Sequence, residues 1–285
     1  MKIVKNLISK MKFLIVNRPA FYLSGRKYAE YILFIGRVHS LLNKKHISSY
    51  SIFPSKNIPN FDLHSVKFGK TTIYFQSAYR ISRFLKGFEN AGKRMWNRYE
   101  IDKLIGAEVP SAILDIGANI GEFAFYSNKR FKEQIKIIAV EPDCIALECL
   151  KKNLMETSIL IEPVAASNKK VTQEFFIKTA TADSSLHNPH GDSIRTVVGL
   201  QRIDKIIKNH RLKGPILIKM DTEGHEPEAL LGLSEALDKV KWISIDTGPE
   251  RSGARTTEQV VKILSNFGFT QIQVSKKDIV TASRF

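Results

Sequence analysis

AILDIGANIG, residues 112–121, joins an apolar run to a turn that contains two glycines. The run predicts a buried strand, and the segment after it, GEFAFYSNKRF, predicts a helix. Gly117 and Gly121 allow positive φ and a close approach of a ligand, and Asn119 tolerates left-handed backbone geometry. The first N–H groups of the helix lack partners within the helix. The segment therefore predicts a strand–turn–helix unit that can bind a ligand at its turn.

The same alternation of strand, turn and helix continues along the rest of the chain. Strands are expected at KIIAVEP (136–142), ILIEPVAA (159–166), PILIKMD (215–221), VKWISID (240–246) and, as the closing strand, FTQIQVS (269–275). Helices are expected at CIALECLKKNL (144–154), EPEALLGL (226–233) and TTEQVVKILSNFG (256–268). Strands that alternate with helices pair in parallel. The expected fold class is α/β, with a Rossmann-like, doubly wound, mostly parallel sheet.

The N-terminal part follows a different pattern and is expected to be an extension of helices and a hairpin. We predict a basic helical extension and linker at 1–60, with the linker itself at 48–59, SSYSIFPSKNIP. The main domain then spans 61–285, with its core at 111–275. The alternating segment 64–76, which contains Gly69-Lys70, predicts a β-hairpin. Residues 93–109 predict a helix that ends before Pro110.

The net charge of +16 is unevenly distributed. Residues 1–103 hold 20 Lys and Arg against 5 Asp and Glu, whereas residues 104–285 hold 24 against 23. Residues 1–16 combine an apolar stripe with interleaved lysines, which is typical of an amphipathic basic helix. This helix has three candidate roles: packing on its own domain, forming a homodimer, or peripheral contact with a membrane surface.

The cysteine content indicates a reducing compartment. Cys144 and Cys149 are too few for a disulfide framework, and their spacing does not match a zinc site. No apolar run approaches the roughly 20 residues that a spanning helix needs. We expect a cytoplasmic protein, with peripheral membrane association as the alternative.

The glycine-bearing turn favours S-adenosylmethionine (SAM) over a dinucleotide. A dinucleotide fingerprint needs G-x-G-x-x-G, whereas this turn reads G-x-x-x-G after Asp115. The carboxylate of Asp115 would repel a pyrophosphate and would suit the ammonium and sulfonium groups of SAM. Glu141 follows Gly121 by 20 residues, at the end of the next strand. A carboxylate there can accept hydrogen bonds from both ribose hydroxyls.

At this point the chain resembles the FkbM family of class I SAM-dependent methyltransferases. The resemblance rests on ILDIGANIGEFAFYS, AVEPD, CLKKNL and LIKMDTEGHEPEALLG, and it covers roughly residues 93–275. It implies O-methylation of sugars or polyketide hydroxyls. The candidate cofactor-binding residues are Asp115, Gly117, Ala118, Asn119, Gly121 and Glu141. Many members have Glu where this chain has Asp246, followed by TGPER, so the resemblance leaves the role of this position open.

The candidate catalytic residues are Asp221, His225 and Asp246. Asp221 and Asp246 end two strands, and in an open α/β sheet ligands bind outside the carboxyl ends of the strands. Methyl transfer to an alcohol needs a group that takes the hydroxyl proton. Asp221 is the first candidate for this base and His225 the second. An alternative is a Mg²⁺ site formed by Asp221, Glu223 and Asp246.

Two other functions compete with a small-molecule or glycan O-methyltransferase. A nucleic-acid methyltransferase agrees with the net charge and with the basic and aromatic residues of 79–98. Against it, the turn at Asp221 is acidic and lacks the D/N-P-P-Y/F pattern of amino methylation, so nucleic acid is not the expected partner. A non-catalytic scaffold with a SAM-binding fold is the other alternative. Ser184, Ser185 and His187, in an inserted stretch at 168–213, are further candidates for the acceptor side.

Overall fold

The computed structural model describes residues 47–59, 61–178, 183–188 and 193–284. Its strands are β1 (Ile47–Pro54), β2 (Asp62–Phe68), β3 (Thr71–Phe75), β4 (Ala112–Ile116), β5 (Lys136–Val140), β6 (Leu160–Glu162), β7 (Ala165–Ala166), β8 (Thr172–Ile177), β9 (Ile194–Gln201), β10 (Ile216–Met220), β11 (Val240–Asp246), β12 (Gln271–Val274) and β13 (Ile279–Ser283). Its helices are η2 (Ala78–Phe84), α3 (Phe88–Arg98), α4 (Ile101–Ile105), α5 (Glu122–Arg130), α6 (Cys144–Asn153), α7 (Ile203–Asn209), α8 (Glu226–Leu231), η3 (Leu237–Lys239) and α9 (Thr257–Asn266), where η marks a 3-10 helix.

The central sheet has seven strands among the described residues, in the order β12-β13-β11-β10-β4-β5-β6. Neighbours from β11 to β6 pair in parallel, and β13 pairs antiparallel with both β11 and β12. The chain runs outward from β4 to β5 and β6, and later outward from β10 to β11. The order therefore reverses between β4 and β10, which is where open α/β sheets bind ligands. The predicted α/β, doubly wound, mostly parallel fold is confirmed.

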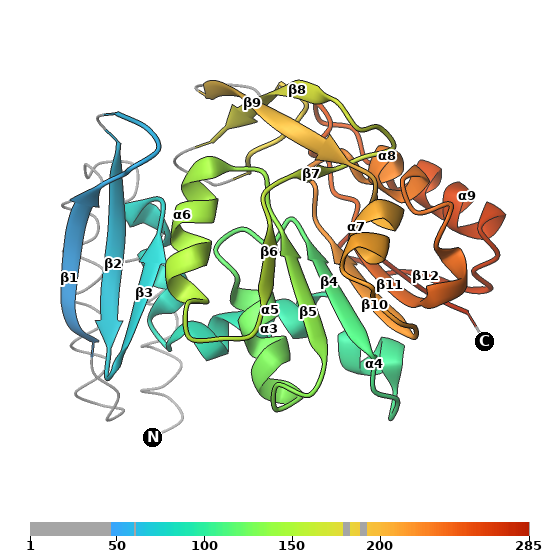
Figure 1. The fold of residues 1–285 in the computed structure, drawn as a ribbon, viewed down its shortest axis with the longest axis horizontal. Helices are drawn as coiled ribbons and strands as arrows, with labels where there is room; N and C mark the ends of the chain where they lie inside the picture. The colour runs from blue at the N-terminus through green and yellow to red at the C-terminus, as the bar shows by residue number, and fades with distance from the viewer. Residues whose placement is uncertain (1–46, 60, 179–182, 189–192, 285) are drawn as a thin grey trace, which may run out of the picture.

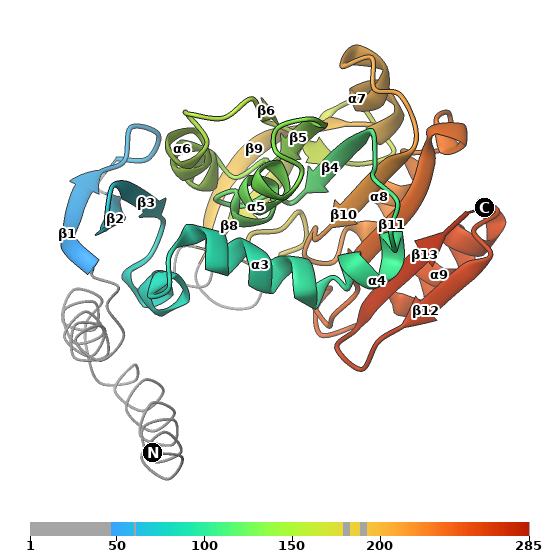
Figure 2. The same ribbon diagram turned by 90° about the horizontal axis from the view of Figure 1, so that it is seen from below.

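Helices cover both faces of this sheet, which explains why its strands are apolar along their whole length. Leu114 points into a core shared with α7, α8 and α9. Its neighbour Ile113 points into the opposite core, shared with α3, α4, α5 and α6. Figure 2 shows α3 and α4 running in line along one side of the molecule, next to α5 and the ends of β4 and β11.

The N-terminal sheet β1-β2-β3 is antiparallel and flanks the central sheet beside α6 (Figure 1). The hairpin predicted at 64–76 is confirmed as β2 and β3. The linker predicted at 48–59 was wrong, because most of that segment is β1, which pairs with β2 along its whole length. The helix predicted at 93–109 is two helices, because Glu100 adopts a left-handed backbone (φ 52°) between α3 and α4.

The stretch between β6 and β10 adds a third, smaller sheet in the order β7-β9-β8. Figure 1 shows this sheet at the top of the molecule, beyond the ends of the central strands. The segment ILIEPVAA, predicted as one strand, is two: β6 belongs to the central sheet and β7 to the small one.

The C-terminal end of the central sheet also differs from the prediction. β12 occupies the predicted closing segment, but the chain continues into β13, which lies between β12 and β11. All five residues of β13 are buried. The predicted core ended at residue 275 and did not include this strand.

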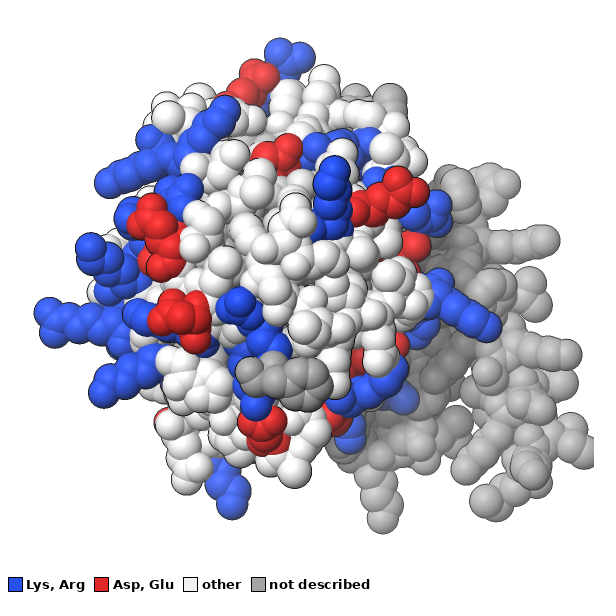
Figure 3. Space-filling view, turned by 90° about the vertical axis from the view of Figure 1, so that its right-hand side faces the viewer, with Lys and Arg blue, Asp and Glu red and all other residues white. Residues whose placement is uncertain are grey.

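The predicted basic helix at 1–16 lies outside the described residues, so its three candidate roles stay predictions. Among the helices that are described, none is long and apolar enough to cross a membrane. Figure 3 shows the face at the right of Figure 1, where basic and acidic side chains are interspersed around an uncharged centre. A nucleic-acid footprint would require a continuous basic patch, and the described residues form none on this face.

Candidate active site

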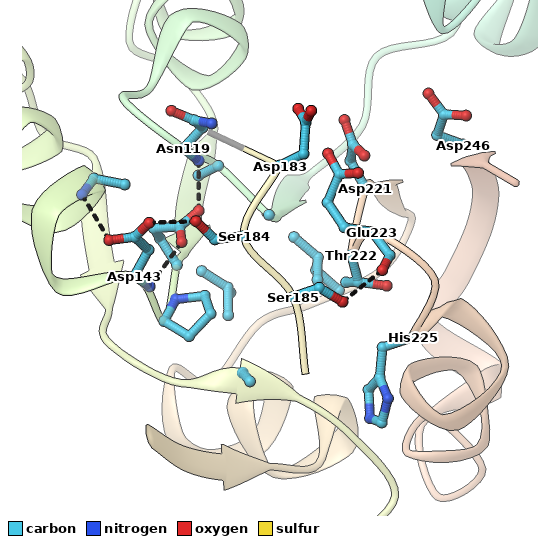
Figure 4. Close-up of a pocket in the computed structure, with 18 of the residues that line it drawn as sticks. Asn119, Asp143, Asp183, Ser184, Ser185, Asp221, Thr222, Glu223, His225 and Asp246 are labelled. Carbon is cyan, nitrogen blue, oxygen red and sulfur yellow. Dashed lines mark hydrogen bonds between the residues drawn. The ribbon is translucent and has the colours of Figure 1, made fainter. Parts of the chain in front are cut away.

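A cavity of about 470 Å³ opens at the carboxyl ends of β4, β5, β10 and β11, where the sheet order reverses. This volume is typical of small-molecule sites. The segment from η2 to α3 lines one side of the cavity, and β7, β8 and residues 183–186 line another. Figure 4 shows the carboxylates of Asp183, Asp221 and Glu223 on the same side of the cavity, with Asp143 across from them.

The turn after β4 needs glycine for two different reasons. Gly117 has φ 71°, and a Cβ atom there would lie 1.7 Å from the carbonyl oxygen of Asp221. Glycine is thus the one residue that lets the turn pass directly against the end of β10. Gly121 has φ 94°, and its Cβ would meet Leu150 of α6 at 2.7 Å. Gly117 lines the cavity, whereas Gly121, predicted to do so, packs α5 against α6.

Glu141 lies at the end of β5 and faces the glycine turn. Its Oε2 accepts a hydrogen bond from the backbone N–H of Asn119 at 2.7 Å, and its Oε1 from the N–H of Asp143 at 2.9 Å. Burial and the neighbouring carboxylate of Asp143 raise the pKa of Glu141 to about 8. Each carboxylate oxygen can accept a further hydrogen bond, so Glu141 can still receive two ligand hydroxyls. Ala118 and Asn119 line the same part of the cavity.

Asp115 was predicted to line the cofactor site, but its side chain is fully buried and does not reach the cavity. It forms an ion pair with Lys219 of β10 at 3.1 Å, because the two residues are directly opposite in adjacent strands. Lys219 Nζ donates to the carbonyl oxygen of Gly117 at 2.8 Å. Asp115 therefore positions Lys219, and Lys219 in turn stabilises the glycine turn through its hydrogen bond to Gly117.

The other end of the cavity contains two anchored carboxylates. Asp221 directly follows β10, and its Oδ2 accepts a hydrogen bond from the hydroxyl of Tyr99 at 2.6 Å. Burial and nearby Asp221 raise the pKa of Tyr99 well above its usual value, so this hydroxyl remains a donor. Asp246, at the end of β11, forms an ion pair with Arg98 of α3. Burial and nearby Asp221 raise the pKa of Asp246.

Two further acidic residues complete this end. Burial and the charge of Asp221 raise the pKa of Glu223 well above its usual value. Burial and the charge of Asp246 raise the pKa of Glu250 to about 7. This end of the cavity is therefore acidic, and its carboxylates compete with one another for ionisation.

His225 belongs to a different group of side chains. Its Nε2 lies 3.1 Å from Ser167 Oγ, and its Nδ1 lies 3.3 Å from Nε2 of His187. Burial lowers the pKa of His225 to about 4. In Figure 4 its ring points away from Asp221 and Glu223. His225 lines the cavity, but the structure does not bring it together with Asp221 as a joint catalytic pair.

The candidate Mg²⁺ site does not assemble among the described residues, where the carboxylates of Asp221, Glu223 and Asp246 form no cluster within ligand distance of one another. A group that does come within that distance is His187, His225 and Glu228. Glu228, however, already forms an ion pair with Arg251.

Several cavity residues were not predicted from the sequence, namely Arg80, Arg83, Arg98 and Lys219, and Tyr99 reaches the cavity through its hydrogen bond to Asp221. The three arginines belong to the basic and aromatic segment 79–98, whose composition suggested nucleic acid. The structure instead places three arginines of that region in the cavity wall. Ser184 and Ser185, predicted for the acceptor side, line the cavity and bond to Asp143 and to the carbonyl of Glu223.

Comparison with known proteins agrees with this architecture. The methyltransferase FkbM domain matches residues 115–270, which is more than half of the chain. The chain belongs to the FkbM methyltransferase family. The predicted family is thus confirmed, and with it the cofactor SAM on which this family depends. The site fits this cofactor: Gly117 leaves room at the turn, Glu141 offers acceptors for two hydroxyls, and Ala118 and Asn119 line the wall between them.

Two proteins with similar sequences are also methyltransferases. The hexuronic acid methyltransferase AglP of Haloferax volcanii is 24% identical, over 49% of this chain and 57% of its own length. This chain thus spans little more than half of that relative. The methyltransferase sdnD of Sordaria araneosa is 27% identical, over 57% of this chain and 76% of its own length. A SAM-dependent methyltransferase structure from Aquifex aeolicus has 13% identity and a TM-score of 0.38, covering 68% of this chain and 96% of its own.

Proposed function

We propose that this FkbM methyltransferase transfers a methyl group from SAM to a hydroxyl group of a sugar, a glycan or a related small molecule. The observation that carries the proposal is the position of Asp221, which ends β10 at the point where the strand order reverses. Its Oδ2 is held by Tyr99, and none of the described residues donates a hydrogen bond to its Oδ1. A fixed carboxylate with an open oxygen is suited to take a proton.

The acidic and polar lining supports a hydroxyl-rich acceptor. Asp221, Glu223, Asp246 and Glu250 lie around one end of the cavity and offer hydrogen-bond acceptors to hydroxyl groups. The name of AglP adds support, because that relative acts on a hexuronic acid.

Each of the chain's own groups has one task in this reaction. When bound, SAM supplies an electrophilic methyl group on a sulfonium. Asp221 Oδ1 accepts the hydroxyl proton as the acceptor oxygen forms its bond to carbon and the carbon–sulfur bond breaks. Tyr99 fixes the carboxylate, and Arg98 holds Asp246 against the same wall. The products are a methyl ether and S-adenosylhomocysteine (SAH).

A transfer assay with matched acceptors tests the proposal. The protein is incubated with SAM labelled in its methyl group and with nitrophenyl glucoside, nitrophenyl glucuronide or a total glycan extract. Mass spectrometry should find one added methyl group that resists mild alkali, because an ether survives conditions that cleave a methyl ester. Asp221→Asn should abolish the product, and Asp238→Asn, an exposed carboxylate on η3, should not. Label on nitrogen, on nucleic acid or in an alkali-labile ester would overturn the proposal.

A further inference from the structure

Arg80 lines the cavity but takes no part in the proposed proton transfer. It belongs to η2, and its guanidinium lies beside the glycine turn. Its Nη1 donates to the side-chain oxygen of Asn119 at 3.2 Å and lies 3.5 Å from Oε1 of Gln76. Both acceptors are neutral amides, so these contacts orient the guanidinium without neutralising its charge.

The neighbouring cavity arginines differ from Arg80 in this respect. Arg83 forms an ion pair with Glu122 at 2.9 Å, and Arg98 forms one with Asp246. Within the described part of the chain, Arg80 forms no ion pair with a carboxylate. Burial lowers the pKa of Arg80, an effect opposed by the more distant charges of Glu122 and Asp183 and reinforced by Arg83. A half-buried cation without an anionic partner has lost part of its hydration without an ion pair to replace it.

We propose that Arg80 is the binding residue for a ligand carboxylate in this cavity. A guanidinium presents a planar pair of N–H donors that matches the two oxygens of a carboxylate. Arg80 carries five N–H groups, and the contacts to Asn119 and Gln76 engage Nη1 alone. The remaining donors can reach a ligand without breaking either contact.

The cofactor is one source of this carboxylate, and its position favours it. Asn119 links the two ends of such a ligand: its backbone N–H bonds to Glu141, and its side-chain oxygen accepts from Arg80. A nucleoside held at Glu141 would thus extend its amino-acid part along the turn toward Arg80. An acidic acceptor, such as a uronic acid, is the second source. That source rests on the proposed function, whereas the cofactor source does not.

Calorimetry with two matched ligands tests the cofactor source. SAH carries the carboxylate, and its decarboxylated analogue keeps the ammonium, the sulfur and the nucleoside. Arg80→Met should weaken SAH binding on the order of 10- to 100-fold, the loss of a charged hydrogen-bonded contact. Binding of the decarboxylated analogue should change by less than about threefold, since the lost contact is absent from it. Retained binding of this analogue also shows that the variant is folded.

Two further variants sharpen the result. Arg80→Lys keeps the charge but not the planar pair of donors, so it should recover part of the SAH affinity. Arg94→Met removes an exposed arginine of α3 that does not line the cavity, and should bind both ligands normally. An equal loss for both ligands in Arg80→Met would overturn the cofactor source, because Arg80 would then only support the turn.

The acceptor source has its own outcome. If Arg80→Met binds SAH normally but loses affinity for nitrophenyl glucuronide and not for nitrophenyl glucoside, the carboxylate belongs to the acceptor. If Arg80→Met binds SAH and both glycosides as tightly as the wild type does, the proposal is overturned. Because the SAH measurement needs no methyl transfer, its result stands apart from the test of the proposed function.

Discussion

The two ends of the cavity are built in different ways. The cofactor end consists of the turn after β4 and the end of β5, and its main contact, from Asn119 to Glu141, spans 22 residues. The acceptor end is assembled from distant segments: Tyr99 and Asp221 are 122 residues apart, and Arg98 and Asp246 are 148 apart. The first end depends on backbone geometry, and the second on side chains that α3 brings across the sheet.

This difference explains what a substitution should change at each end. A change at the cofactor end should alter backbone packing and therefore stability and cofactor affinity together. A change at the acceptor end should leave the backbone in place and alter turnover alone. Three predictions test this separation, beginning with the largest effect.

The largest effect is expected at Asp221. Asp221→Asn keeps the size of the side chain but removes the oxygen that takes the proton, so turnover should fall by roughly 10²–10⁴. SAH affinity, measured by calorimetry, should stay nearly unchanged. Steady-state kinetics with the acceptor found in the transfer assay provide the rate.

The same experiment can contradict this assignment in three ways. Loss of SAH binding and of folding would make Asp221 a structural residue. Near-normal turnover in Asp221→Asn with none in His225→Ala would make the histidine the base. Loss of turnover in the wild type after treatment with a chelator would instead indicate a bound metal ion.

The next effect is expected at Gly117. In Gly117→Ala the new Cβ would collide with the Asp221 carbonyl on a backbone with positive φ. Together these should lower the free energy of unfolding by about 3 kcal/mol. The control is Gly69→Ala, where φ is 62° and nothing lies within 4 Å, so only about 1 kcal/mol should be lost. Thermal unfolding and SAH calorimetry measure both variants, and equal losses would disprove the importance of the close approach.

The smallest effect is expected from the ionisation of Glu141. Its pKa in the folded chain is about 8, so most molecules hold a proton there at pH 7. An ionised carboxylate accepts ligand hydroxyls more strongly, so SAH affinity should rise several-fold between about pH 7 and pH 9. The free energy of unfolding should fall over about pH 4.5 to 8, because the folded state holds this proton more tightly than the unfolded state does.

Glu141→Gln supplies the control for this pH dependence. The amide cannot ionise, so both the rise in SAH affinity and the fall in stability should flatten in this variant. A pH dependence of SAH binding that persists unchanged in Glu141→Gln would assign it to another group.

The sequence predicted which strand ends meet at the cavity, but not the side chains that hold them there. The glycine turn and Glu141 follow consecutive strands, so their proximity follows from the fold class alone. Tyr99 and Arg98 could not be assigned, because their partners depend on how α3 crosses the sheet. Asp115 was misplaced for a related reason: the sequence showed a carboxylate before the turn but not Lys219 opposite it in β10. β13 was missed because the strand before it already completed the expected alternation of strands and helices.

The position of β13 has a consequence for how the sheet is completed. Among the described strands, β12 pairs only with β13, although β13 comes later in the chain. β12 therefore cannot join the sheet before Ile279–Ser283 is available, because β13 is its link to β11. Pairing of β13 with β11 spans the whole of α9 and β12, and it is slower than pairing within a hairpin because a longer loop must close first. A cut between β12 and β13 should consequently detach both strands and expose the apolar side of α9 that packs beneath them.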